Sequence, residues 1–592
     1  MPLGGIMEVK MPSTFFGLNI GTTGLYTYQA ALNNTAHNVA NAETKGYSRQ
    51  ILNQHAGVAI RVNSRYGMVG TGVDVESIKQ VRNEYYDLKY RKNNTLYGNY
   101  STKDYYMKEV ENNFNEINME GFTTSFNKLF DSLQELSKDP SSLTVRTQVT
   151  NFATSLTEYF NSLSNSMRGI QEECNFEVKN QVDRINSLSK QIASLTKQIN
   201  NLETGGGTAN DLRDARALLV DDLSKIANIT VDEKIVGDNV GVTSYVVKLN
   251  GQTLVDNYDY NTLKIVPRTI KANQNDIDGL YDITWDNGQS FDPLSSTLTG
   301  SLKALFEVRD GNNLENLTGI VNGKAGEETI TLTSPSITNV ERLNIPSEGV
   351  IVVGNKEYKY KSFEYDDDSK QYKFTLEEKL DSDITNANAT IGKAINYKGI
   401  PYYMGQMNEF VRTFAKSFND IHTDGQDLNG ENGLDFFNVM ESKNGEKMGS
   451  KDGIPYYMLT AGNFTITEAI SKDPSKLAIA ESIIDGVEDK KILNALIALK
   501  SDGSMFKQGA PASFLQTLVA EIGIDADKAA TFSESQSNML YMIHNQRLSE
   551  SGVDVDEEAM NLVKFQNAYN LSAKVIQIMN EIYNKLINDT GV

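Results

Sequence analysis

The stretch from residue 554 to 588 is predicted to form a helix that cannot bury its apolar side chains by itself. It contains neither Gly nor Pro, and the helical repeat gathers its apolar residues into two adjacent stripes. The first stripe comprises Phe565, Tyr569, Ile576, Met579, Tyr583 and Leu586, and the second comprises Ala568, Leu571, Val575, Ile578 and Ile582. A face this wide can cover two neighbouring helices. It is typical of an association surface, although a core helix of a globular domain would show the same pattern.

The N-terminal segment has the same character. Leu18, Leu25, Leu32 and Val39 recur every seven residues, as in a helix with a narrow coiled-coil seam. Chain termini usually fray, so apolar stripes at both ends favour association over a globular core. We therefore predict an assembly seam made of Leu18, Leu25, Leu32, Val39, Phe565, Tyr569, Ile576, Met579, Tyr583 and Leu586.

Changes of hydrophobic period divide the chain between these ends. Helical spacing, clearest from Val178 to Leu202, gives way to a period of two with a hairpin signal at Asn250-Gly251. The expected segments are an axial helix and turn (11–60), a helical stem domain (61–228), a β domain (229–299), a helix (300–310), an inserted β-rich module (311–398), a mixed return to the stem (399–550) and a C-terminal axial helix (551–592). The predicted fold is α+β and multidomain: terminal helices form a coiled-coil-like stem, and antiparallel all-β domains are inserted in the middle.

Composition excludes several classes of function. The formal net charge is −21, so no excess of Lys and Arg is available to neutralise nucleic-acid phosphates or to dock on an anionic membrane. Cys174 is the single cysteine, which rules out an intrachain disulfide and a cysteine zinc cluster. The apolar stretches all fall short of the roughly 20 residues that span a bilayer. The sequence also lacks the basic segment and apolar run of an ordinary signal peptide.

Catalytic motifs are absent from the sequence. The four histidines are not followed by Glu, as a zinc-protease motif requires, and neither a phosphate-binding P-loop nor a G-x-S-x-G elbow occurs. Residues 424–435 are as rich in oxygen ligands as a calcium loop. When the EF-hand template starts at Asp427, however, Asn432 stands at its Gly position and Asn438 at its closing Glu position, so a plain turn is expected. We predict no catalytic, cofactor or metal site. An enzyme or ligand-binding module in 311–398 is the rival hypothesis, without a motif to support it.

The stretch NVANAETKGYSRQ (38–50) carries the most specific signal. Asn38 and Asn41 suit a helix end, Gly46 can take a left-handed turn, and Tyr47 offers a rigid anchor, so we interpret the stretch as the join between terminal helix and stem. It resembles the N-terminal signature of bacterial flagellar axial proteins, the rod, hook and hook-associated proteins. The matching residues, with the Ser-Arg-Gln continuation that resembles the hook-associated protein 1 branch, are Asn38, Val39, Ala40, Asn41, Thr44, Gly46, Tyr47, Ser48, Arg49 and Gln50.

Other parts of the chain resemble the same branch. They are residues 210–224, 300–310, 427–438, 464–480 and 551–588. The likeness is weak over 311–398. Members of the family tend to begin near Met11, so residues 1–10 are expected to be an extension or tag.

The resemblance implies a structural adaptor at the junction of flagellar hook and filament, secreted unfolded through the type III export channel. The implied partners are copies of itself in a ring, the hook protein, the second junction protein of the hook-associated set and an export chaperone. No cofactor, nucleic acid or membrane insertion is implied. A hook, rod or filament subunit is the alternative within the same class. The lack of disulfides and of an ordinary signal peptide agrees with export through a narrow channel.

Overall fold

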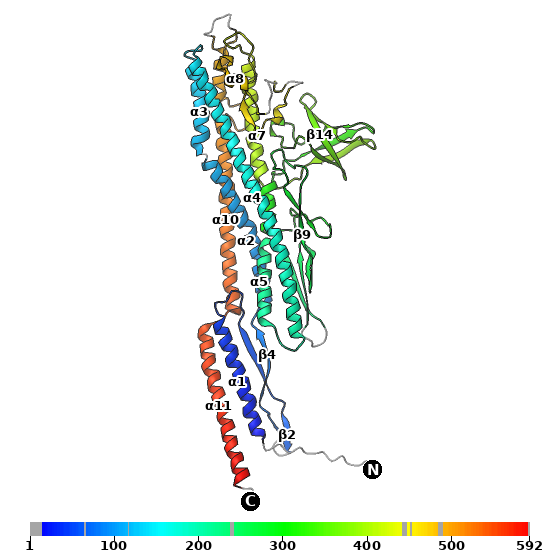
Figure 1. Ribbon diagram of the computed structural model, residues 1–592, viewed down its shortest axis with the longest axis vertical. Helices are drawn as coiled ribbons and strands as arrows, with labels where there is room; N and C mark the ends of the chain where they lie inside the picture. Colours follow the sequence, from blue (N-terminus) through cyan, green and yellow to red (C-terminus); the bar gives the residue numbers. More distant parts are fainter. Residues whose placement is uncertain are drawn as a thin grey trace. The chain divides into compact units, whose positions relative to one another are not determined.

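The computed structural model describes residues 15–63, 67–116, 118–236, 242–440, 447–449, 453–482 and 489–589 (Figure 1). The predicted extension, residues 1–10, lies outside this range. The chain divides into two compact units. Unit 1 comprises residues 1–97, 184–262 and 536–592, and unit 2 comprises residues 98–183 and 263–535. No helix in the described ranges is long and apolar enough to cross a bilayer.

Unit 1 contains both terminal helices, a long two-stranded ribbon and a four-stranded sheet. Helices α1 (Phe16–Ala40) and α11 (Val555–Asn588) pack along each other (Figure 1). The ribbon pairs β1 (Gln50–Ala56) with β4 (Val73–Gln80) and continues into β2 (Ile60–Asn63) and β3 (Gly67–Val69). The sheet has the order β5-β6-β7-β8, formed by Ile229–Ile235, Thr243–Leu249, Gln252–Asp256 and Asp259–Tyr260. Unit 1 also holds α5 (Asn210–Ile226), the start of α2 (Glu84–Glu116), the end of α4 (Leu143–Glu203) and the end of α10 (Pro511–Ser551).

The ribbon corrects one sequence prediction. A helical stem domain was predicted over 61–228, but residues 60–63, 67–69 and 73–80 form strands, and the first helix within this range begins only at Glu84. Most side chains of β1 and β4 are partly or fully exposed. A two-stranded ribbon has no deeply buried face, so its sequence shows no clear alternation of apolar and polar residues.

Unit 2 combines long helices with a closed β-barrel. The barrel order is β11-β12-β15-β14-β13-β16, formed by Leu317–Gly323, Thr329–Thr333, Gln371–Leu376, Lys356–Asp366, Gly349–Val353 and Ile384–Ile391. Its interior is filled by apolar side chains such as Val321, Tyr372 and Phe374, each at most 1% exposed. Unit 2 also holds the remaining parts of α2, α4 and α10. Its other elements are α3 (Asn118–Leu136), β9 (Leu263–Pro267), β10 (Tyr281–Trp285), α6 (Ser301–Asp310), α7 (Ile400–Thr423), β17 (Phe437–Val439), β18 (Phe464–Ile466), α8 (Glu468–Lys472), α9 (Lys491–Ala498) and the 3-10 turns η1 (Val340–Arg342), η2 (Tyr456–Met458), η3 (Pro474–Lys476) and η5 (Leu499–Ser501).

The predicted fold class is confirmed: helices occupy the two termini, and antiparallel sheets occupy the middle of the chain. The hairpin predicted at Asn250-Gly251 joins β6 to β7, and both turn residues have positive φ, as a type I′ turn requires. The helical stripe that begins at Val178 is buried as far as Ile199, except for Leu195, which is half-buried. Leu202 is 59% exposed and does not belong to the core, because α4 ends one residue later, at Glu203.

Candidate functional site

The first candidate site is the contact between the terminal helices. Helix α1 turns three glycines toward α11, and we call Gly17, Gly21 and Gly24 the glycine stripe. A Cβ atom added to Gly17 would lie 2.5 Å from Met579 Cε, one on Gly21 would lie 2.8 Å from Ile576 Cγ1, and one on Gly24 would lie 2.9 Å from Ser572 Oγ. The helices thus approach so closely at these positions that no larger side chain fits without a shift.

The predicted seam residues divide between two environments. On α11, Ile576 and Met579 face the glycine stripe, and Tyr583, 7% exposed, packs its ring 5.0 Å from that of Phe15. Phe565 and Tyr569 are half-buried, whereas Leu586 is 50% exposed. On α1, the four predicted residues Leu18, Leu25, Leu32 and Val39 are all half-buried.

The buried face of α1 therefore differs from the predicted one. It consists of small and polar residues: Gly21, Gly24, Thr27, Ala31, Asn34, Thr35 and Asn38. A search for hydrophobic periodicity misses such a face, because glycine and alanine pack closely without being strongly apolar. The role of the half-buried leucines in assembly stays a prediction.

The second stripe of α11 remains exposed to solvent. Leu571 is 68% exposed, Val575 42%, Ile578 45% and Ile582 49%. We call these four residues the exposed stripe. They lie three or four positions apart and share one side of the helix, so unit 1 presents a continuous apolar strip along α11.

The second candidate site is the segment after α1, where the signature residues lie. Helix α1 ends at Ala40, and Asn41 caps it by donating from Nδ2 to the main-chain oxygen of His37 at 3.0 Å. Gly46 has φ +82°, which confirms the predicted left-handed turn. Ala40 and Thr44 are exposed. Asn38, Tyr47, Ser48, Arg49 and Gln50 form the contacts described next.

Asn38 is the centre of this segment and is 1% exposed. Its Nδ2 donates to the main-chain oxygen of Gln50 (2.9 Å) and to Glu558 Oε2 (3.3 Å). Its Oδ1 accepts from the main-chain N–H of Gln50 (3.0 Å) and from the hydroxyl of Tyr47 (2.8 Å). One side chain therefore joins the end of α1, the start of β1 and the first turn of α11.

Ser48 and Arg49 extend these contacts to two more helices. Ser48 donates from its main-chain nitrogen and its hydroxyl to the two carboxylate oxygens of Asp214 on α5, at 2.8 and 2.7 Å. Arg49 donates from Nε to Glu558 Oε1 at 2.7 Å and from its main-chain nitrogen to the oxygen of Ser551 at 2.8 Å. We call Asn38, Tyr47, Ser48, Arg49 and Gln50, with Asp214 and Glu558, the joint.

Burial and charge keep Tyr47 protonated in the joint. Burial raises the pKa of the Tyr47 phenol, and the carboxylates of Asp211, Asp214 and Glu558 raise it further. The hydroxyl therefore remains a donor to Asn38. Burial also raises the pKa of Asp214, while the bonds from Ser48 and the charge of Arg82 act in the opposite direction.

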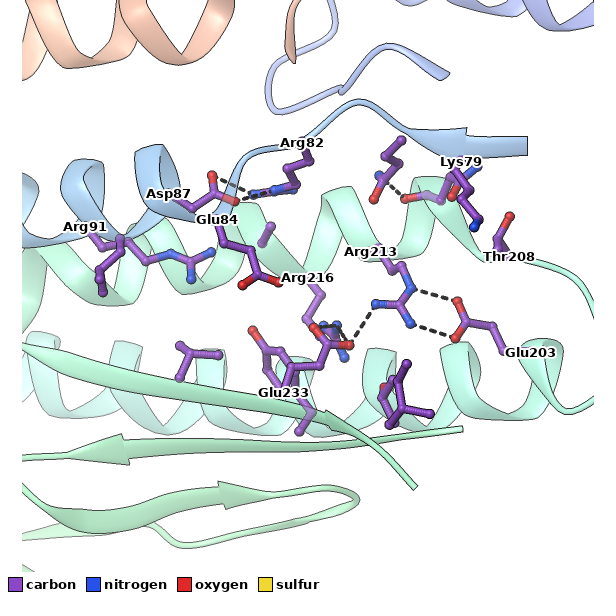
Figure 2. A pocket seen from close by; sticks show the side chains of 18 of the residues that line it. Lys79, Arg82, Glu84, Asp87, Arg91, Glu203, Thr208, Arg213, Arg216 and Glu233 are labelled. Carbon is purple, nitrogen blue, oxygen red and sulfur yellow. Dashed lines mark hydrogen bonds and ion pairs between the residues drawn. The ribbon is translucent and has the colours of Figure 1, made fainter. Parts of the chain in front are cut away.

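A charged cavity of about 670 Å³ lies beside α5 in unit 1 (Figure 2). Arg213 forms two bonds of 2.7 Å with Glu203 and one of 2.7 Å with Glu233, and Arg216 also binds Glu233. The Arg216 guanidinium lies 3.5 Å above the Tyr245 ring. These charges are paired with one another and stabilise the packing of α4, α5 and the β5–β6 sheet.

The oxygen-rich loop of residues 424–435 is a turn, as expected. Asp427 Oδ1 accepts from the main-chain nitrogens of Asn429 (2.7 Å) and Glu431 (3.0 Å), an Asx-type arrangement. Within the described ranges, no group of three His, Cys, Asp or Glu side chains is arranged to hold a metal ion.

Comparison with known proteins identifies the family. A model described as "Flagellar hook-associated protein FlgK helical domain" matches residues 107–325 and 330–437. The chain belongs to the flagellar hook-associated protein FlgK family. A second model, "Flagellar basal body rod FlgEFG protein C-terminal", matches residues 544–589, which include all of α11.

Full-length relatives of this FlgK-family chain carry the same description. "Flagellar hook-associated protein 1" of Bacillus subtilis is 27% identical, over 98% of this chain and 99% of the relative. The Escherichia coli protein of that name is 26% identical, over 96% and 99%. Among solved structures, the flagellar hook junction protein FlgK from Burkholderia pseudomallei matches at 14% identity with a TM-score of 0.45, over 78% of this chain and 100% of that chain.

Proposed function

We propose that this protein is a non-catalytic adaptor that joins the flagellar hook to the filament, and that its copies assemble into a ring through their terminal helices. The exposed stripe of α11 carries the proposal. It is apolar and lies beside the face of α11 that already packs on α1. In a homo-oligomeric ring, a second copy of the chain would cover the exposed stripe.

The energetics favour covering this strip. Fully burying an aliphatic side chain contributes about 1.5–3 kcal/mol. The four residues of the exposed stripe still expose roughly half of their surface, so covering them contributes about 4 kcal/mol for each copy. In a ring, each copy would gain this stabilisation, whereas in a monomer the exposed stripe stays in contact with water.

Family membership supports the other parts of the proposal. The relatives are named as hook-associated proteins, so we infer that this chain is exported through the type III channel and acts at the hook–filament junction. We propose the hook protein, the second junction protein and an export chaperone as its further partners. We propose no cofactor and no nucleic-acid partner.

Charge substitutions in the exposed stripe test the assembly role. In cells that lack the native protein, Leu571→Asp and Ile578→Asp should be exported but lost to the medium, leaving hooks without filaments. Asn570→Asp is the matched control, because it adds the same charge at a neighbouring exposed position of α11, and it should restore motility. Normal filaments on cells that carry both stripe substitutions would contradict the proposed assembly surface.

A hook, rod or filament subunit is the competing assignment. The helical-domain match over 107–437 favours the hook-associated branch, whereas the C-terminal match includes rod proteins. Immunoelectron microscopy of purified flagella separates them, since a junction protein labels one narrow band at the distal end of the hook. Label along the whole hook, rod or filament would overturn our assignment.

A further inference from the structure

The end of α10 is attached to unit 1 largely through polar contacts. Within residues 536–551, all of which the structure describes, Ile543 is the single large apolar side chain that is fully buried. Met539, Tyr541, Met542 and Leu548 are 42 to 67% exposed. This part of α10 therefore gains little from apolar burial, and another interaction must hold it against its neighbours.

Arg547 supplies that interaction. Its Nε lies 2.9 Å from Asp87 Oδ1 on α2, and its Nη1 lies 2.6 Å from Asp221 Oδ2 on α5. The guanidinium also lies 5.1 Å from the centre of the Tyr90 ring. The side chains of Arg547, Asp87 and Asp221 are 15, 9 and 8% exposed, so solvent screens these ion pairs far less than it would screen surface pairs.

Each of the two aspartates also forms an ion pair with another arginine. Asp87 also binds Arg82 at 2.5 Å, and Arg82 lies 3.1 Å from Asp214, the partner of Ser48 in the joint. Asp221 binds Arg91 at 2.8 Å. The result is one row of alternating charges, which in spatial order is Arg91, Asp221, Arg547, Asp87, Arg82 and Asp214.

We propose that this row is an internal latch that Arg547 closes, and that opening it frees the end of α10 from α2 and α5 while the rest of unit 1 stays folded. Arg547 is the only member on α10. The other five lie on α5 or on α2 and the residues just before it, and they keep ion pairs with one another when Arg547 leaves. The latch is independent of the proposed function, because it concerns contacts within one chain.

Hydrogen exchange of the full-length protein tests the latch. Arg547→Gln should raise exchange at amides 540–551 at least tenfold, while amides of α2 (85–97) and α5 (212–224) stay within threefold of the native protein. Lys89→Gln is the matched control. It removes an exposed contact to Gln546 of 3.2 Å and should leave all three segments unchanged.

Three outcomes would overturn the proposal. Native protection of 540–551 in Arg547→Gln would show that Arg547 does not hold α10. Equal loss of protection across α2 and α5 would show that Arg547 supports the folding of the whole unit.

A double-mutant cycle with Ser48→Ala tests whether the row of charges acts as one unit. The combined effect on exchange of 540–551 should differ at least threefold from the product of the single effects, because both residues act on the same row, and independent effects would contradict a continuous latch.

Discussion

Asn38→Ala should separate the terminal helices from the rest of unit 1. The substitution removes four hydrogen bonds at a position that is 1% exposed. The main-chain N–H of Gln50 and the carboxylate of Glu558, which is 2% exposed, each lose a partner in a buried setting. A buried polar group without its partner costs about 1–3 kcal/mol, and more if it is charged. We therefore expect a loss of about 3–5 kcal/mol in the local stability of the joint.

Hydrogen exchange measures this loss directly. Each 1.4 kcal/mol or so accelerates exchange about tenfold when opening is at equilibrium. Amides 47–50 and those in the first turns of α11 should then exchange roughly a hundredfold to several thousandfold faster. Asn33→Ala is the control, because Asn33 is exposed on the same helix and alanine is the better helix former. Its exchange should be equal to or slower than that of the native protein.

The position of the single tryptophan gives an independent check. Trp285 lies in unit 2 and is 3% exposed, so its fluorescence reports the unfolding of that unit. The Asn38→Ala protein should keep the native urea midpoint by this probe. Exchange at 47–50 within tenfold of the native rate would show that Asn38 is not essential to the joint.

Three further predictions follow from other contacts. Gly21→Val should loosen α1 from α11 by about 1–3 kcal/mol through overpacking against Ile576, and native exchange in both helices would contradict this. Burial lowers the pKa of His422 to about 4. The free energy of unfolding of unit 2, followed by Trp285 fluorescence, should therefore be highest above pH 6.5 and fall by about 3 kcal/mol as the pH decreases to 4. A His422→Gln protein should show a shallower fall, and parallel curves for the two proteins would contradict this prediction. The fully buried Arg412 donates to the main-chain oxygens of Leu343, Tyr457 and Leu459. Arg412→Met should therefore lower the free energy of unfolding of unit 2 by about 3–5 kcal/mol. A decrease below about 1 kcal/mol, measured by urea denaturation, would contradict this prediction.

The signature segment shows how far sequence reasoning reaches in the candidate site. The helix end at Ala40 and Asn41 and the left-handed Gly46 follow from local preferences, and both are present. The acceptors in the joint could not be found in this way. Asn38 and Glu558 are 520 positions apart, and a single sequence contains no signal for that pairing.

The terminal helices, the β-rich middle and the hairpin turn at Asn250-Gly251 could be predicted from the sequence, because they depend on the repeat of apolar residues and on turn residues that are close in the chain. The side of α1 that meets α11 depends instead on tertiary packing. The leucines have the stronger hydrophobic period, but the glycine stripe permits the closer approach of two helices, and van der Waals packing depends on that distance. The tertiary structure also decided that Asp214, Glu558 and Arg547 hold the elements of unit 1 together, since charges pair according to position in space.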